Sequence, residues 1–280
     1  MNIQWFPGHM TKALRLMQEN VKIVDAVGYV LDARAPFSSF NPAFEKLIDN
    51  KPCLFILNKC DLADNSKIQL WQKYFESQGQ KCVAVSASIG KEIAKIVDGF
   101  KSITTEKIAR YKAKGIKRAI RVMIIGVPNC GKSTIINAIA KKKATITGDR
   151  PGVTRGKQWV AIDNWLELLD TPGTCWSNYQ DQQVAQRLTF IGSIKDDVVD
   201  LYEVSLLLIQ ELKTLYPENF LAKYKVDLTK SNEEILNDIC HLRGFIVKGG
   251  ETDLLRGAKA LLDDFRKGKL GKVTFDTPEI

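Results

Sequence analysis

The segment Gly126–Ser133 reads GVPNCGKS, which has the spacing G-x-x-x-x-G-K-[ST] of a phosphate-binding loop. It follows an apolar run at 120–127 and opens a helical pattern that reaches Ile139. Glycines let backbone N–H groups surround phosphate oxygens, and a helix N-terminus adds favourable partial charge. We expect Lys132 to contact the outer phosphates as a catalytic group and Ser133 to offer its hydroxyl to Mg²⁺. The loop residues expected to contact a nucleotide are Asn129, Cys130, Gly131, Lys132, Ser133 and Thr134.

Two motifs downstream of this loop have the residue types that a bound triphosphate requires. In DTPG, residues 170–173, Asp170 ends an apolar run and could hold Mg²⁺, while Gly173 could offer its N–H to a γ-phosphate during catalysis. DTPG alone could be any β-turn, since Pro and Gly favour turns, but its place after the loop makes it more specific. Thr154, in PGVT at 151–154, is the candidate switch residue, because its hydroxyl could reach Mg²⁺ only when the triphosphate is bound.

A further motif, NKCD at 58–61, has the chemistry to select guanine. The carboxylate of Asp61 could accept hydrogen bonds from the ring N–H and the exocyclic amine of guanine, an edge that adenine lacks. A site of this kind discriminates by roughly 10⁴ or more. Asn58 and Lys59 would brace the base and the phosphate loop, and a backbone N–H of Ser86 or Ala87 could meet the guanine oxygen. A lone N-K-x-D favours a helix cap or turn, but here a phosphate loop accompanies it.

The five motifs occur in a rotated order. NKCD and SAS (86–88) precede the phosphate loop, whereas PGVT and DTPG follow it; in most GTPases the phosphate loop comes first. Rotation is physically allowed, because chain ends that lie close together can be joined and new ends opened in a loop. The sequence therefore predicts a circularly permuted domain that binds GTP and GDP and hydrolyses GTP. Its switch-bearing half runs directly into the C-terminal part of the chain.

The elements that must position these motifs are short apolar runs alternating with helical patterns. Runs at 26–33, 53–59, 81–87 and 120–127 suit buried parallel strands, and residues 157–171 suit a hairpin. This alternation predicts an α/β fold with a doubly wound, mainly parallel sheet. After residue 178 helical periodicity dominates. We expect a permuted GTPase domain at 1–177, with halves 1–109 and 119–177 and a linker at 110–118, and a small all-α domain at 178–280.

Composition excludes several classes of protein. The 280 residues are 45% hydrophobic and 26% charged, which is ordinary for a globular chain. No apolar run reaches the roughly 18 residues that a membrane helix needs, and the N-terminus does not resemble a secretory signal. The six cysteines are scattered without metal-ligand spacing, so we interpret them as free thiols of a reducing compartment. We expect a cytoplasmic protein without a membrane partner.

Charge is distributed unevenly along the chain. The net charge is +9, and residues 1–180 hold 27 basic and 15 acidic residues, against 14 and 17 in residues 181–280. The segment KKKATITGDRPGVTRGK at 141–157 holds six basic residues and one acidic residue. A solvated face and a nucleic-acid contact both remain open for this segment.

Taken together, the motifs resemble those of the circularly permuted GTPases, most closely the YlqF/RbgA family of ribosome biogenesis GTPases. The resemblance runs along nearly the whole chain and includes QWFPGHMTKA (4–13), DARAP (32–36), NKCD, PNCGKS, PGVT, DTPG, RGFIVKGGETD (243–253) and LLDDFRKGKLG (261–271). It implies binding to the large ribosomal subunit and its rRNA during late assembly, hydrolysis stimulated by that subunit, and no DNA partner. It also implies an RNA-contacting helical domain. Basic residues of its last third could make that contact or form a solvated face: Arg243, Lys248, Arg256, Lys259, Arg266, Lys267, Lys269 and Lys272.

Three positions bear on the catalytic mechanism. Many GTPases have a Gln after the DTPG-like motif that orients the attacking water, whereas this chain has Thr174, which is too short for that role. His9, in the family-like WFPGHM, could supply the missing contact as a neutral imidazole, or could be a structural histidine. GTPases that resemble this one at Asn129 often bind K⁺ through the Asn oxygen, although Asn129 could instead only stabilise the loop.

The leading hypothesis is a GTP-hydrolysing switch acting on the large ribosomal subunit. Two alternatives stay open. One is a GTP-sensing RNA-binding module with negligible hydrolysis, and the other is a GTPase in tRNA modification or translation.

Overall fold

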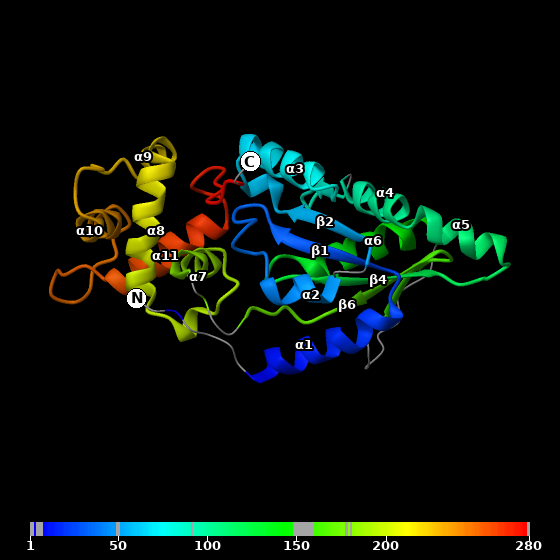
Figure 1. The fold of residues 1–280 in the computed structure, drawn as a ribbon. Helices are drawn as coiled ribbons and strands as arrows, with labels where there is room; N and C mark the ends of the chain where they lie inside the picture. The colour runs from blue at the N-terminus through cyan, green and yellow to red at the C-terminus, as the bar shows by residue number, and fades with distance from the viewer. Residues whose placement is uncertain are drawn as a thin grey trace.

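The structure is a computed structural model that describes residues 3, 8–48, 51–90, 92–147, 159–176, 179 and 181–278, except for the side chains of residues 9 and 142–147. Its centre is a six-stranded sheet with the order β3-β2-β1-β4-β6-β5 (Figure 1). Neighbouring strands are parallel, except that β5 and β6 form the expected antiparallel hairpin. The predicted mainly parallel α/β sheet is confirmed. The strands are β1 Ala26–Asp32, β2 Cys53–Asn58, β3 Lys81–Ala84, β4 Ile120–Ile125, β5 Trp159–Asp163 and β6 Leu166–Asp170.

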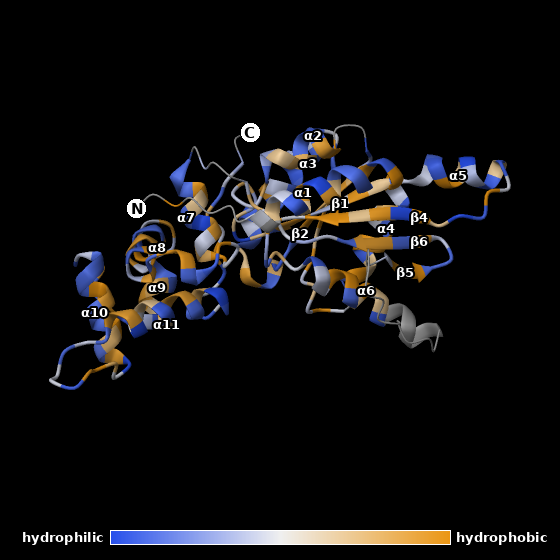
Figure 2. Ribbon diagram, turned by 90° about the horizontal axis from the view of Figure 1, so that it is seen from below, coloured by the Kyte–Doolittle hydropathy of each residue, from blue (hydrophilic) through white to orange (hydrophobic). Residues whose placement is uncertain are grey.

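Alternate residues of the central strands pack on opposite faces of the sheet. On one face, Val27, Tyr29 and Leu31 of β1 pack with α1 (Gly8–Asn20) and α3 (Asn65–Ser77). On the other face, Ala26 and Val30 pack with α4 (Ile93–Ile103) and α6 (Lys132–Thr147). Every residue of β1 is buried, as expected for a central strand covered on both sides. Figure 2 shows these apolar strands at the centre of the molecule, with helices around them.

The other helices near the sheet are short. They are α2 Glu45–Ile48, α5 Thr105–Ala113 and the 3₁₀ turns η1 Val21–Ile23, η2 Pro42–Phe44 and η3 Cys60–Leu62. The first four residues of the segment 110–118, which was expected to be a linker, form the last turn of α5. The helix ends at Ala113, and Gly115, just after its C-cap Lys114, adopts the left-handed conformation (φ 63°) common after helix C-termini. Among the helices that the structure describes, none is long and apolar enough to cross a bilayer.

Beyond residue 181 the chain is helical, as its periodicity predicts. These helices gather at one end of the molecule, beside the carboxyl ends of β1 and β2 (Figure 1). We call residues 182–266 the helical end. The short helix from Pro217 was not expected, although proline is favoured in the first turn of a helix. The helices are α7 Gln182–Phe190, α8 Leu201–Leu215, α9 Pro217–Tyr224, α10 Asn232–Leu242 and α11 Leu254–Arg266, with a 3₁₀ turn, η4 Asp196–Val198, after α7.

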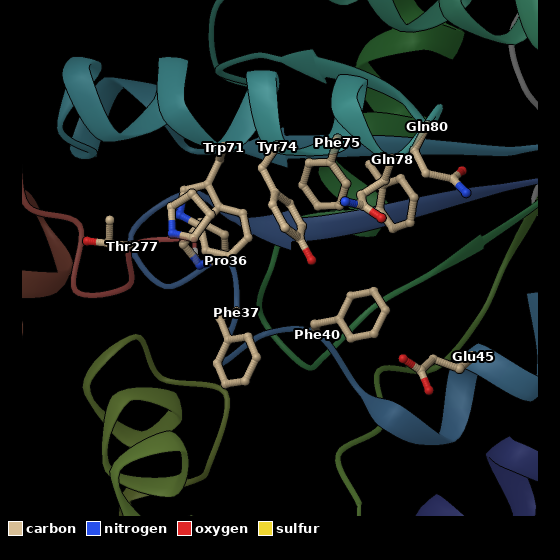
Figure 3. Close-up of a pocket in the computed structure, with 12 residues that line it drawn as sticks. Pro36, Phe37, Phe40, Glu45, Trp71, Tyr74, Phe75, Gln78, Gln80 and Thr277 are labelled. Carbon is tan, nitrogen blue, oxygen red and sulfur yellow. The ribbon is translucent and has the colours of Figure 1, made fainter. Parts of the chain in front are cut away.

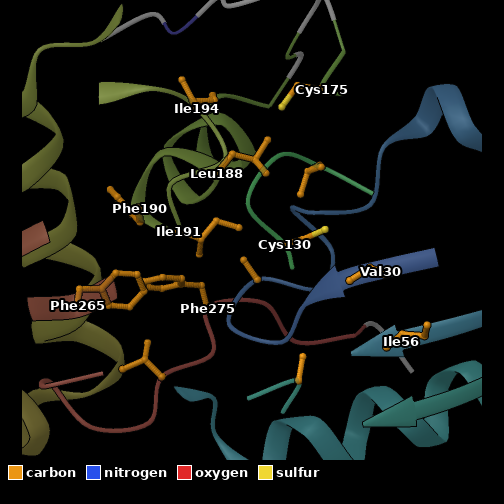
Figure 4. Packing of buried hydrophobic residues seen from close by; sticks show 14 of the residues in the cluster. Val30, Ile56, Cys130, Cys175, Leu188, Phe190, Ile191, Ile194, Phe265 and Phe275 are labelled. Carbon is orange, nitrogen blue, oxygen red and sulfur yellow. The ribbon is translucent and has the colours of Figure 1, made fainter. Parts of the chain in front are cut away.

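One buried apolar cluster joins the sheet to the helical end (Figure 4). It begins with Val30 and Ile56 on the central strands and continues through Cys130 of the phosphate loop. From there it reaches Leu188 at the end of α7 and Phe265 in α11. Because this cluster is continuous, the loop between β4 and α6 packs directly against the helical end.

A C-terminal tail, residues 272–278, returns from α11 to the sheet half of the molecule. The backbone N–H of Val273 donates to the Leu62 carbonyl at 3.1 Å, and that of Phe275 donates to the Arg34 carbonyl at 2.8 Å. The Trp71 indole N–H donates to the Asp276 carbonyl at 3.2 Å. Beside the tail lies a hollow of about 410 Å³ with aromatic walls (Figure 3). The tail therefore fastens the helical end to the first half of the sheet.

Candidate nucleotide site

The phosphate loop lies between β4 and α6, where its sequence places it. Gly126 (φ 151°) and Gly131 (φ 101°) adopt backbone conformations that favour glycine. A Cβ on Gly131 would collide with the Asn58 side chain, so this turn has no room for a larger residue. The buried ammonium of Lys132 donates to the carbonyls of Gly126 at 3.1 Å and Val127 at 2.9 Å. Lys132 is therefore held inside the loop whose N–H groups would surround phosphate.

The hydroxyl of Ser133 and the carboxylate of Asp170 meet where a divalent cation would be needed. The Ser133 hydroxyl donates to Asp170 Oδ2 at 2.8 Å, which joins the start of α6 to the end of β6. The other carboxylate oxygen, Asp170 Oδ1, is buried and has no hydrogen-bond partner among the described residues. A hydroxyl beside a carboxylate with an unpaired buried oxygen fits Mg²⁺, which prefers oxygen ligands. Thr154, the third expected ligand, lies outside the described residues.

The DTPG segment packs closely against the phosphate loop. The Thr171 hydroxyl donates to the Ile124 carbonyl at 2.6 Å. A Cβ built on Gly173 would lie 2.6 Å from Pro128 Cα and 2.8 Å from Lys132 Nζ, so only glycine fits here. Thr174 is fully buried, and its carbonyl accepts a hydrogen bond from the Asn41 amide at 3.0 Å. The Thr174 side chain is therefore buried as well as short, and both properties make it unsuited to orient an attacking water.

Helix α1 forms one wall of this site. A hollow of about 690 Å³ is bounded by the phosphate loop and by residues 169–173, and Leu16 and Asn20 of α1 complete it. His9 lies in the first turn of the same helix, about 10 Å along the axis from Leu16 at 1.5 Å per residue. The side chain of His9 is outside the description, so the structure fixes only the helix that carries it.

On the base side, Asn58 links two loops. Its amide Nδ2 donates to the Cys130 carbonyl at 2.8 Å, and its Oδ1 accepts from the Ala87 N–H at 3.1 Å. Lys59, in the left-handed conformation (φ 63°), donates to the Asn129 carbonyl at 2.6 Å. Both residues thus contact the phosphate loop, in the positions that the bracing role expects.

Asp61 is exposed, and its backbone N–H donates to the Ser86 hydroxyl at 2.9 Å. The N–H of Ser86 donates to the Glu92 carboxylate at 2.6 Å, and that of Ala87 donates to Asn58. A guanine oxygen that binds either N–H must therefore replace a side-chain acceptor. NKCD and SAS nevertheless lie together at the carboxyl ends of neighbouring strands, beside the phosphate loop.

Two charged residues at this site were not among the expected ones. The buried carboxylate of Asp32, at the end of β1, pairs with Lys59 Nζ at 2.9 Å and with Arg34 Nη2 at 2.8 Å. Burial raises the pKa of Asp32, but the two cations outweigh it and hold that pKa well below its usual value. An acidic residue that ends a wholly buried strand was the available signal, since a buried charge requires a partner.

A turn at residues 191–193, after α7, contacts the phosphate loop from the helical end. The Asn129 amide nitrogen donates to the Gly192 carbonyl at 2.6 Å. The Ser193 hydroxyl donates to the Pro128 carbonyl at 2.8 Å. Asn129 has a left-handed backbone (φ 58°), and the hydrogen bond from its amide nitrogen fastens the loop to this turn, while its side-chain oxygen is the atom expected to bind K⁺.

Comparisons with known proteins agree with this geometry. A family model described as 50S ribosome-binding GTPase matches residues 121–237. Curated proteins named ribosome biogenesis GTPase A are similar along their whole length. The protein from Bacillus pumilus is 42% identical with 100% of both chains covered, and that from Priestia megaterium is 43% identical over 99% of this chain and 98% of its own. The protein from Thermotoga maritima is 30% identical over 99% of this chain and 95% of its own.

Solved structures give the same result. GDP-bound YlqF matches with a TM-score of 0.68 and 27% identity, covering 95% of this chain and 100% of that one. GNP-bound YlqF from T. maritima matches with a TM-score of 0.66 and 28% identity, covering 96% of this chain and 99% of that one. Because the curated relatives from Bacillus pumilus and Priestia megaterium are 42% and 43% identical over nearly their full length, the chain belongs to the ribosome biogenesis GTPase A family.

Proposed function

We propose that this protein is a GTP-hydrolysing switch that acts in late assembly of the large ribosomal subunit. One observation carries the proposal. The phosphate loop, the Ser133–Asp170 pair and the NKCD motif lie together at the carboxyl edge of one sheet, although they come from different halves of the chain. Ligands of open α/β sheets bind at this edge. The full-length similarity to proteins named ribosome biogenesis GTPase A supports the ribosomal role.

The chain's own residues divide the work at this site. Lys132 would leave its carbonyl partners for the outer phosphates, and the Gly173 N–H would meet the γ-phosphate. Asp61 would accept the two guanine donors, and Asn58 and Lys59 would keep the base side fixed to the loop.

Two cations complete the proposed site. Mg²⁺ would be held by Ser133 and Asp170, with Thr154 as a further ligand, and when bound it would offset negative charge on the phosphates. K⁺ would be held by the Asn129 oxygen and would stabilise charge that develops during hydrolysis. Turnover should therefore fall when K⁺ is replaced by Na⁺ at equal concentration. Equal rates in the two salts would count against a K⁺ site.

The proposed partner is the large subunit, through its rRNA, in the cytoplasm. We assign the GTPase function to residues 1–177 and RNA contact to the helical domain at 178–280. Several basic residues of that domain are occupied by ion pairs, namely Arg243 and Lys269 with Asp264, Arg266 with Asp196, and Lys267 with Asp263. The contact would then fall mainly to Lys248, Arg256, Lys259 and Lys272.

The deciding experiment measures GTP turnover with and without purified large ribosomal subunits. A switch GTPase should hydrolyse slowly alone, because no glutamine follows DTPG, and much faster with the subunit. Slow turnover in both conditions with intact subunit binding would instead support the GTP-sensing module. Stimulation by tRNA or translating ribosomes, but not by large subunits, would support the translation alternative.

A further inference from the structure

The buried carboxylate of Asp32 connects the nucleotide site with the helical end. It is fully buried, and its two oxygens are bound by two cations that serve different parts of the molecule. Arg34 donates through Nε to Oδ1 at 2.9 Å and through Nη2 to Oδ2 at 2.8 Å. Lys59 lies 2.9 Å from Oδ2, so both cations share this oxygen.

On one side of Asp32 lies the phosphate loop. Lys59 Nζ, paired with Asp32, also donates to the Asn129 carbonyl at 2.6 Å. The lysine side chain keeps some exposure, whereas the carboxylate has none. Asp32 thus fixes the ammonium group that holds NKCD against the loop.

On the other side lies the helical end. Arg34 is almost fully buried, and its Nη2 and Nη1 lie 3.4 Å from the carbonyls of Ile191 and Arg266 respectively. Its guanidinium carbon lies 5.3 Å from the centre of the Phe265 ring, within reach of a cation–π contact. The rigid fork of arginine thus contacts the turn after α7, the end of α11 and Asp32 at once.

We propose that Asp32 is a positioning residue for nucleotide binding, and that through Arg34 it couples the placement of the helical end to nucleotide affinity. The inference rests on the proposed nucleotide site. Because the two cations share one carboxylate oxygen, a shift of the helical end that turns Arg34 also changes the pairing of Lys59. Coupling of this kind is reciprocal, so nucleotide binding must also stabilise the docked helical end.

The test compares Asp32→Asn with a matched control, Asp25→Asn. Asp25 immediately precedes β1, whereas Asp32 ends it, and Asp25 also pairs with a lysine and an arginine, Lys107 and Arg118. The asparagine keeps the shape of the side chain and removes its charge. Two quantities are measured for each full-length variant: the affinity for fluorescent GDP, and amide hydrogen exchange in peptides covering 186–196 with and without GDP.

We expect Asp32→Asn to weaken GDP binding about tenfold or more, the scale of a charged hydrogen bond. It should also abolish the protection of 186–196 that GDP produces in the unchanged protein, while Asp25→Asn keeps both properties. GDP affinity within twofold of the unchanged protein would overturn the proposal, as would an equal loss in Asp25→Asn. Failure of the unchanged protein to bind GDP would overturn the proposed function, and this inference with it.

A second variant covers the case in which Asp32→Asn does not fold. Arg34→Lys keeps a cation beside Asp32 but lacks the fork that reaches both helical-end carbonyls. It should reduce GDP-dependent protection of 186–196 and weaken GDP binding severalfold. Unchanged affinity together with unchanged protection would overturn the coupling.

Discussion

Among single residues, Asp61 differs from its neighbours in exposure. Asn58 and Ser86 are buried and hydrogen-bonded, whereas Asp61 is exposed and its backbone is held by one hydrogen bond to Ser86. Buried polar side chains of this kind fix loop positions, and an exposed carboxylate is available to a ligand. We therefore propose that Asp61, rather than Asn58 or Ser86, recognises the base.

Replacing Asp61 by asparagine should change the preferred base. The substitution exchanges an acceptor for a donor, so xanthosine nucleotides should bind better than guanosine nucleotides. Competition of XDP and GDP for the same site measures this directly. A variant that still prefers GDP as strongly as the unchanged protein would remove NKCD from base recognition.

His9 is proposed to orient the attacking water in place of the glutamine that the chain lacks. His9→Ala should leave GTP affinity and subunit binding intact, while subunit-stimulated turnover falls by roughly 10²-fold, the scale of one general base or positioning group. His241→Ala is the matched control, since His241 is the other histidine and lies exposed in α10. Stimulated turnover of His9→Ala within about twofold of the unchanged protein would exclude this role.

Local chemistry explains which site residues the sequence could identify. The phosphate loop consists of neighbouring residues, so its spacing alone predicts it, whereas NKCD becomes a base-site prediction only because a phosphate loop accompanies it. Arg34 was different, because its partners Ile191 and Arg266 lie far along the chain and are backbone carbonyls without a sequence signature. The hydrogen bond from Asn41 to the carbonyl of buried Thr174 is likewise one that no short pattern connects.

At the scale of elements, the close contact between DTPG and the phosphate loop is possible because Gly173 has no side chain. Gly173→Ala should prevent this approach, since the new Cβ would meet the backbone of Pro128 at 2.6–2.7 Å. We expect GTP turnover to fall about 10²-fold, as misplacement near the reacting group produces, with GDP affinity less affected. Gly90→Ala is the control, because its Cβ would meet nothing within 4 Å. Equal turnover in the two variants would contradict the role of Gly173.

The types of the elements were predictable from buried apolar runs and from long helical periodicity. Short helices and the ends of helices were less predictable. The buried runs of β1 and β2 gave strands within one or two residues of their bounds. Helix α9 was missed because its eight residues follow α8 after a single residue and are too few to show a clear helical periodicity. Residues 110–118 were expected to form a linker because they are polar, basic and contain Gly, yet polar residues also extend helices such as α5, which continues to Ala113.

For the whole molecule, the uneven charge predicts how a nucleic-acid partner would bind. Charge reversal at Lys141, Lys142 and Lys143 should weaken subunit binding most at low salt, and removing one interaction with a phosphate should reduce the salt slope by roughly 0.7–0.9. Reversal at Lys112, Lys114 and Lys117 changes the net charge equally on exposed residues around the end of α5. Binding of the 141–143 variant that matches the unchanged protein across a salt series would leave this segment as a solvated face.

The C-terminal tail also determines the order in which parts of the molecule can be joined during synthesis. A nascent chain leaves the ribosome N-terminus first, and segments that emerge early begin to fold first. Residues 272–278 emerge after both of the parts they fasten together, so Leu62, Arg34 and Trp71 lack their tail partners until those residues have emerged. The nascent chain therefore completes its sheet before the helical end is secured to it. We expect the helical end and the sheet to be joined only after residues 272–278 have left the ribosome.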